Sequence, residues 1–259
     1  MGKKNTKVGI CRLCKKSKEL SFEHVPPKVA FNKNTKYYSI PHQDVLTAPN
    51  PFEYKPKGMI YQGGMGYYSL CRDCNSFLGT HYVRDFAKWA NIGMDINSKY
   101  TFEYAEILVE NVNPLFILKQ IVSMFICMNQ PWYTEEYPEL LEFVKNPESR
   151  HLPKRYRIYT YMNDEGQIRT WGWVQTNIYG AFGEFTFPPF GYVLTLNDGY
   201  TTPNLTNITS FKDYENRRDL TMLLGLRKHP TYLAIPLDYR KKCDIKKAIK
   251  ADDCDEEGD

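Results

Sequence analysis

The chain has 259 residues, of which 42% are hydrophobic and 15% aromatic, enough to pack one large or two smaller domains. Its net charge of +4 hides an asymmetry, because residues 1–100 hold 16 Lys and Arg against 7 Asp and Glu. The longest apolar run, Leu115 to Met128, contains Lys119, Gln120 and Ser123, so it is too short and too polar to span a bilayer. We expect no membrane segment.

Two Cys-x-x-Cys pairs lie in the basic half of the chain. They are Cys11 with Cys14 and Cys71 with Cys74. Pairs with this spacing can hold one tetrahedral zinc ion. Disulfides are the alternative, but the seven cysteines are an odd number and the opening MGKKNTKVGI has no apolar signal core. The sequence therefore predicts structural zinc and a reducing, cytoplasmic location.

The segments around these pairs follow a strand, strand, helix order. Leu20–His24 is predicted to be a short strand that ends at the prolines after Val25, and residues 31–68 a long loop or irregular hairpin. Tyr67–Leu70 is predicted to be a second strand, followed by a helix from Asn75 to about Ala90.

A second unit is predicted after residues 92–100, where the apolar pattern is interrupted. Asn113 and Pro114 are typical of a helix start and precede a buried helix over Leu115–Met128. From Tyr156 the pattern alternates, which predicts an antiparallel meander of strands at 156–162, 168–175, 183–187 and 192–196. A helix is predicted over Tyr214–Leu226.

Aromatic side chains are frequent in this second unit. They can be a base-stacking surface, but alternating aromatics are more often core, which we favour here for Trp171, Trp173, Phe182, Phe185, Phe187 and Phe190. His42, His81, His151 and His229 are assigned no catalytic role.

Glu23, His24 and Asn75 have the residue types needed to hydrolyse a phosphodiester. A neutral imidazole at His24 can take the proton of an attacking water. The oxygens of Glu23 and Asn75 are suited to Mg²⁺ or Mn²⁺. Lys15, Lys16, Lys18 and Lys28 place positive charge in the same segment, which favours a nucleic-acid partner over a plain solvated surface.

These features resemble the HNH, or ββα-metal, endonuclease superfamily, and most closely its zinc-bearing branch that includes recombination endonuclease VII. The resemblance covers roughly the first 90 residues. It implies that His24 is the general base, that Glu23 and Asn75 hold the catalytic metal, and that the four cysteines hold zinc. Many members carry an asparagine that orients the base about five residues before the second cysteine pair; here that position is Gly66.

The sequence thus predicts an α+β protein in three parts. Residues 1–98 would be a zinc-stapled, treble-clef-like ββα-metal nuclease domain. Residues 99–250 would be an α+β domain with an antiparallel sheet that recognises a target or a protein partner, and 251–259 a disordered acidic tail.

Three hypotheses for its function follow. The first is a metal-dependent endonuclease acting on DNA, which by analogy alone suggests a bacterial or phage-related antiviral defence protein and allows a homodimer. The second is a nucleic-acid-binding zinc module whose catalytic site has decayed, and the third is a protein-interaction module.

Overall fold

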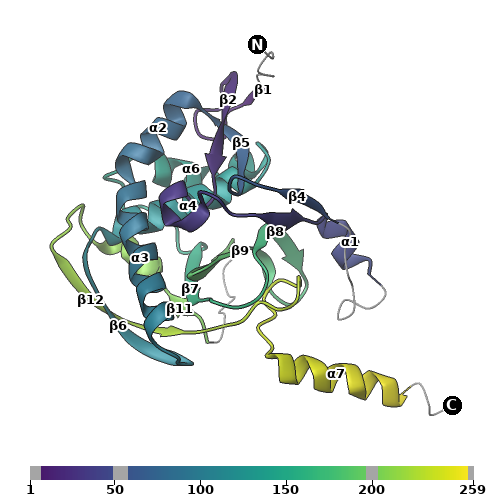
Figure 1. Ribbon diagram of the computed structural model, residues 1–259. Coiled ribbons are helices and arrows are strands. Elements are labelled where there is room, and N and C mark those ends of the chain that lie inside the picture. The colour runs from purple at the N-terminus through teal and green to yellow at the C-terminus, as the bar shows by residue number, and fades with distance from the viewer. Residues whose placement is uncertain (1–6, 49–57, 197–203, 256–259) are drawn as a thin grey trace.

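A computed structural model describes residues 7–48, 58–196 and 204–255 of the chain. It shows a mixed α+β fold whose sheets are all antiparallel (Figure 1). The class predicted from the sequence is therefore confirmed.

The N-terminal part is built on a three-stranded sheet of order β1-β2-β5. Strand β1 spans Lys7–Ile10, β2 spans Ser17–His24 and β5 spans Gly66–Cys71. The two predicted strands are both present, each slightly longer than expected. Because β5 leads directly into helix α2, Arg72–His81, the predicted strand, strand, helix order is also present.

The helix predicted from Asn75 to Ala90 is interrupted. Helix α2 ends at His81, and α3 spans Val83–Lys99. Tyr82 lies between them, fully buried, and its hydroxyl donates to the carbonyl of Val144 at 2.6 Å. The sequence pattern missed this break because the apolar residues on both sides of Tyr82 face the same core.

Residues 31–68 contain more regular structure than a loop. Strands β3, Tyr37–Ser39, and β4, Met59–Tyr61, form a two-stranded ribbon, and the short helix α1 spans His42–Leu46. Figure 1 shows this ribbon reaching out beside strand β8, with α1 at its far end. Of the two predictions for residues 31–68, a long loop or an irregular hairpin, the structure supports the hairpin.

Helix α4, Pro114–Met128, is the centre of the core. The Asn113 side chain accepts a hydrogen bond from the Phe116 amide at 3.2 Å, which confirms the predicted cap. All residues of α4 except the last are buried. The short helices α5, Tyr133–Glu136, and α6, Pro138–Lys145, follow it. Within the described ranges no helix has both the length and the apolar character needed to cross a membrane.

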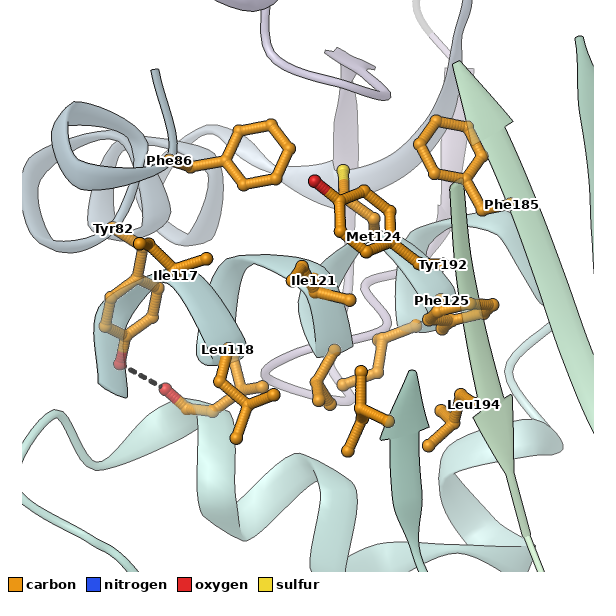
Figure 2. Close-up of a cluster of buried hydrophobic side chains, with 14 of the residues drawn as sticks. Tyr82, Phe86, Ile117, Leu118, Ile121, Met124, Phe125, Phe185, Tyr192 and Leu194 are labelled. Atoms are coloured by element: carbon orange, nitrogen blue, oxygen red, sulfur yellow. Dashed lines mark hydrogen bonds between the residues drawn. The ribbon is translucent and has the colours of Figure 1, made fainter. Parts of the chain in front are cut away.

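The core continues across the predicted boundary after residue 98. Figure 2 shows side chains of α4 between Tyr82 and Phe86 on one side and Phe185, Tyr192 and Leu194 of the large sheet on the other. In addition, Trp89 of α3 stacks on Phe190 with ring centroids 4.3 Å apart. The two predicted units therefore share one hydrophobic core.

The large sheet has the order β11-β7-β10-β9-β8. Its strands are β7, Arg157–Met162; β8, Arg169–Thr176; β9, Gly180–Phe187; β10, Phe190–Thr195; and β11, Thr206–Asn207. The predicted meander is correct for β8, β9 and β10, but β7 pairs with β10 instead of β8. The chain does not fold back after Met162, because residues 163–167 bond to the segment at 229–231.

The helix predicted over Tyr214–Leu226 is wrong. This region contains strand β12, Leu220–Arg227, after a short 3-10 turn, η2, at Thr209–Asp213. Strand β12 pairs along its length with β6, Tyr104–Val112. The leucine-rich sequence looked helical because β6, its partner, had not been recognised as a strand.

The end of the chain also differs from the prediction. Helix α7 spans Lys242–Asp255, so the acidic segment expected to be disordered from residue 251 is helical as far as Asp255. Residues 256–259 lie outside the described part. Figure 1 shows α7 extending away from the body of the molecule.

Candidate functional site

The four predicted cysteines meet at one end of the small sheet. Cys11 and Cys14 lie in the turn between β1 and β2, Cys71 ends β5, and Cys74 lies in the first turn of α2. Their sulfur atoms all lie within 4.8 Å of one another, and those of Cys14 and Cys71 are 3.9 Å apart. Four sulfurs about 2.3 Å from a common ion in a tetrahedron would be about 3.8 Å apart. The cluster can therefore hold a metal ion.

Local hydrogen bonding supports this function for the cluster. The Cys71 amide donates to the Cys11 sulfur at 3.3 Å, a contact that favours a thiolate. Burial raises the pKa of Cys14, but the Lys16 amide and neighbouring thiols outweigh it and bring the pKa down to about 7. Burial raises the pKa of Cys11 and, together with the neighbouring thiols, that of Cys74. Zinc binds thiolates and would stabilise all four sulfurs in that form, so the donor set fits that ion.

Glu23, His24 and Asn75 all line one open pocket of about 280 Å³, with Lys28 at its wall. Glu23 and His24 end strand β2, while Asn75 lies one turn into α2. The cysteine cluster ties together the elements that bear them, because Cys71 and Cys74 flank the start of α2. All three residues predicted to be catalytic therefore line one pocket.

His24 is held by the loop that precedes β5. Its Nε2 lies 3.2 Å from the Gly63 carbonyl oxygen, so Nε2 carries the hydrogen and Nδ1 is left to accept a proton. Burial and the nearby Lys28 ammonium lower the pKa of His24 below its usual 6.5, despite the opposing bond to Gly63. The imidazole is therefore neutral at pH 7, as a general base requires.

Gly66, which stands where the resemblance would place an orienting asparagine, lies directly opposite His24 in the β2–β5 register. The orienting contact comes instead from the carbonyl of Gly63. The sequence analysis did not identify this carbonyl.

Asn32 was missed by the sequence analysis. It is fully buried, donates to the carbonyls of Pro26 and Met65 at 2.7 Å each, and accepts from the Met65 amide at 2.8 Å. These bonds join the segment after His24 to the loop that carries Gly63. The sequence does mark the loop that Asn32 holds, because it contains the glycine pair Gly63 and Gly64. Both have positive φ, a backbone conformation that other residues avoid.

Gly64 packs directly against the His24 ring. A Cβ atom at this position would lie 2.8 Å from the ring's Cδ2 and 2.1 Å from the Asn32 carbonyl oxygen. Only glycine fits at position 64, and its lack of a side chain lets the loop lie in direct contact with the imidazole.

Glu23 is buried although it lines an open pocket. It is 6% exposed, and burial raises its pKa to about 7. Its neighbours Phe22 and His24 have ring centroids 4.8 Å apart, so they share the other face of β2. The carboxylate instead lies on the side of the buried thiol of Cys127, whose pKa it helps to raise. Within the described part of the chain, no Lys or Arg forms an ion pair with it.

Asn75 is positioned by strand β2. Its amide nitrogen donates to the Ser21 hydroxyl at 3.1 Å and lies 3.5 Å from the Phe22 carbonyl. Since the nitrogen is engaged by the strand, the amide oxygen is the atom left to bind a ligand. A hard cation is the ligand that such an oxygen suits.

The predicted basic residues do not form one patch around this pocket. Lys28 lines it. Lys18 pairs with Asp73 at 2.9 Å, and Lys15 donates to the Pro131 carbonyl at 2.9 Å, so both already have partners. Lys16 is exposed. Of the four predicted nucleic-acid contacts, only Lys28 lies at the candidate site.

The remaining candidates behave largely as expected. Five of the six aromatics are buried, which confirms the core assignment for Trp171, Phe182, Phe185, Phe187 and Phe190. Trp173 is 36% exposed and donates to the Tyr137 hydroxyl. His81 packs on Phe77 and does not line the pocket.

Comparison of the chain with protein-family models, with curated proteins and with solved structures gave no match.

Proposed function

We propose that this protein is a metal-dependent endonuclease of the HNH type that hydrolyses phosphodiester bonds in DNA. The observation that carries the proposal is that Glu23, His24, Asn75 and Lys28 all line one open pocket, and that Asn75 directly follows the last residue of the four-cysteine cluster. Glu23 and Asn75 are 52 positions apart in the sequence numbering, and the fold places both in the wall of the same pocket.

His24 is the general base in this proposal. With Nε2–H donated to the Gly63 carbonyl, Nδ1 can remove a proton from water as the water attacks phosphorus. Its lowered pKa keeps the ring unprotonated at neutral pH. Lys28, exposed at the pocket wall, would pair with a phosphate of the substrate.

Glu23 and Asn75 are the residues that would hold the catalytic Mg²⁺ or Mn²⁺. The fit is supported by a buried carboxylate without a basic partner in the described chain, since a divalent cation would offset the burial of its charge. When bound, such an ion neutralises charge on the phosphate and on the leaving oxygen.

The four cysteines would hold zinc with a structural task. They join the β1–β2 turn to the start of α2, and so fix the distance between the end of β2 and Asn75. In a segment whose sheet has only three short strands, this link supplies folding free energy that a small core lacks.

The direct test is incubation of the zinc-loaded protein with supercoiled plasmid, single-stranded DNA and RNA, with Mg²⁺ or Mn²⁺. We expect DNA cleavage that requires the added ion and that Asn75→Ala strongly reduces while retaining zinc. Cleavage that proceeds equally without a divalent ion, or equally in the variant, would refute the metal site.

A nucleic-acid-binding module without cleavage is the second candidate. It is favoured by the depth of Glu23, which is only 6% exposed and faces away from the His24 side of the strand. This candidate predicts salt-sensitive binding of DNA with no cleavage of any substrate by the intact protein.

A further inference from the structure

A second, larger groove adjoins the candidate site on the open face of the small sheet. Its volume is about 620 Å³, within the range of about 300–1,000 Å³ typical of ligand sites. Strands β1, β2 and β5 supply its floor, and the β3–β4 ribbon supplies one wall. No function assigned above uses this groove.

Aromatic side chains dominate the exposed lining of the groove. Phe22, Tyr61 and Tyr68 are 36%, 40% and 40% exposed. Phe22 and Tyr68 contact each other edge to face at 5.4 Å, while Tyr61 stacks on Tyr37 of the ribbon. Aromatic rings left open on a surface are available for stacking on flat ligands such as nucleobases.

The charge of the groove is positive. Lys7 and Arg12 line it, and none of the described lining residues is acidic. The Lys7 ammonium lies 4.2 Å from the centre of the Tyr68 ring. Arg12 is engaged by backbone carbonyls, among them that of Tyr68 at 3.1 Å, so it supports the floor. Lys7 is the exposed cation that can meet a phosphate.

The groove adjoins the candidate active site. Phe22 lines both cavities, and its ring contacts that of His24. Gly64 also lines the groove and packs against the Cδ2–Nε2 edge of the His24 ring. A chain lying along the groove would therefore reach the imidazole.

We propose that this groove, named here the Tyr61–Tyr68 groove, binds single-stranded DNA and leads it to His24. In a duplex the base faces are covered by neighbouring base pairs, so side-chain stacking selects unpaired nucleotides. The choice of DNA rests on the proposed nuclease function. The binding of unpaired bases rests on the groove itself.

Binding is measured by fluorescence anisotropy with a labelled single-stranded DNA and with its duplex. The protein carries His24→Ala, is fully zinc-loaded and has no added divalent ion, so that no cleavage interferes. Tyr61→Leu and Tyr68→Leu are compared with Tyr100→Leu, which removes a ring that is 62% exposed outside the groove. Zinc content and thermal midpoint are matched across all variants.

We expect Kd for single-stranded DNA to rise about tenfold in each groove variant and to stay unchanged in Tyr100→Leu. The duplex should bind at least about tenfold more weakly than the single strand, because its bases cannot stack on the tyrosines. Equal affinity for duplex and single strand, or equal loss in all three variants, would overturn the groove proposal. Tighter binding of RNA of the same sequence would overturn the choice of DNA.

Photo-crosslinking provides a measurement that does not depend on variants. A single-stranded DNA carrying bromodeoxyuridine should form adducts on peptides that contain Tyr61 or Tyr68; adducts found only elsewhere contradict the proposal. These results are separable from those of the cleavage assay. Binding of single-stranded DNA without cleavage would support the groove proposal and contradict the nuclease proposal. Cleavage without a preference for single strands would support the nuclease proposal and contradict the groove proposal.

Discussion

At the scale of single residues, the candidate site depends on how the fold changes the chemistry of Glu23 and His24. Adjacent strand positions place the two side chains on opposite faces of β2. Burial then acts on each in the direction that favours its neutral form, raising the pKa of Glu23 and lowering that of His24. The sequence identified both residues, but it could not give the depth at which each lies.

The pH dependence of cleavage should report His24. At a Mg²⁺ concentration that saturates the site and so keeps Glu23 ionised, activity should rise with pH through a pKa below 6.5 and be level at neutral pH, because a general base must be unprotonated. Lys28→Gln removes a cation that disfavours the imidazolium, so the rise should move to higher pH. Single-turnover rates from pH 5 to 8, with Lys16→Gln as the control, measure this; a shift of the same size in the control would contradict it.

Glu23→Gln should change how stability depends on pH. The folded pKa of Glu23, about 7, is above its ordinary 4.5, so its contribution to stability is complete below pH 4.5 and is lost as pH rises through 7. Without divalent ions, the wild type should lose about 2–3 kcal/mol relative to Glu23→Gln between pH 5 and 8.

Urea unfolding at both pH values, with zinc present, provides the measurement for this prediction. Glu19→Gln, an exposed change on the same strand, is the control and should follow the wild type. Added Mg²⁺ should restore stability to the wild type at pH 8 but not to Glu23→Gln. Parallel stability profiles for Glu23→Gln and the wild type would show that the carboxylate is hydrated in solution.

At the scale of elements, the small sheet and α2 form a frame closed by the cysteine cluster. The strand, strand, helix order was predictable, because prolines end β2 and the cysteine spacing marks both turns. The loop that holds His24 was not, because its bonds run through Asn32 and the carbonyl of Gly63, which leave no periodic signal.

The errors at the element scale share one physical cause, which is pairing between distant segments. Strand β12 pairs with β6 more than 100 residues earlier, and β7 pairs with β10. Local patterns record which residues are apolar but not which strand lies beside which. Helix α4 was predicted accurately, because its cap and its continuous apolar run are local features.

Removal of one cysteine ligand should release the metal ion. Cys74→Ser is expected to abolish stoichiometric zinc binding and to lower the thermal midpoint, since the ion links the β1–β2 turn to α2. Cys243→Ser, which changes an exposed free thiol, is the matched control. Zinc per chain determined by elemental analysis should fall from one to near zero only in Cys74→Ser, and equal zinc in both variants would exclude the four-cysteine site.

At the scale of the whole molecule, the two units expected from the sequence are packed around α4. Arg12, beside the first cysteine, donates to carbonyls including that of Asn129 at the end of α4. Trp89 of α3 stacks on Phe190 and donates to the Tyr192 hydroxyl at 3.0 Å. Composition alone left one domain or two open. The interruption at residues 92–100, taken as a boundary, lies in the last turns of α3 and at its C-terminal cap.

This shared core predicts a single cooperative unfolding transition for the zinc-loaded protein. Trp89→Ala should lower its midpoint without splitting it, at a cost of about 3–5 kcal/mol, because it leaves a cavity between α3 and the large sheet. Differential scanning calorimetry, with Trp132→Ala at a 43% exposed position as the control, tests this. Two separated transitions in the wild type would contradict a common core.

The most direct test of the nuclease account is the single-turnover cleavage rate of DNA by His24→Ala beside His81→Ala. Both variants should be fully zinc-loaded and be assayed with Mg²⁺ or Mn²⁺ at pH 7.5. His24 is proposed to be the base, whereas His81 packs on Phe77 and Tyr82 and does not line the pocket. We therefore expect a loss of about 10²–10⁴-fold in the first variant and almost none in the second. Equal cleavage by the two variants would show that His24 is not the general base and would contradict the account.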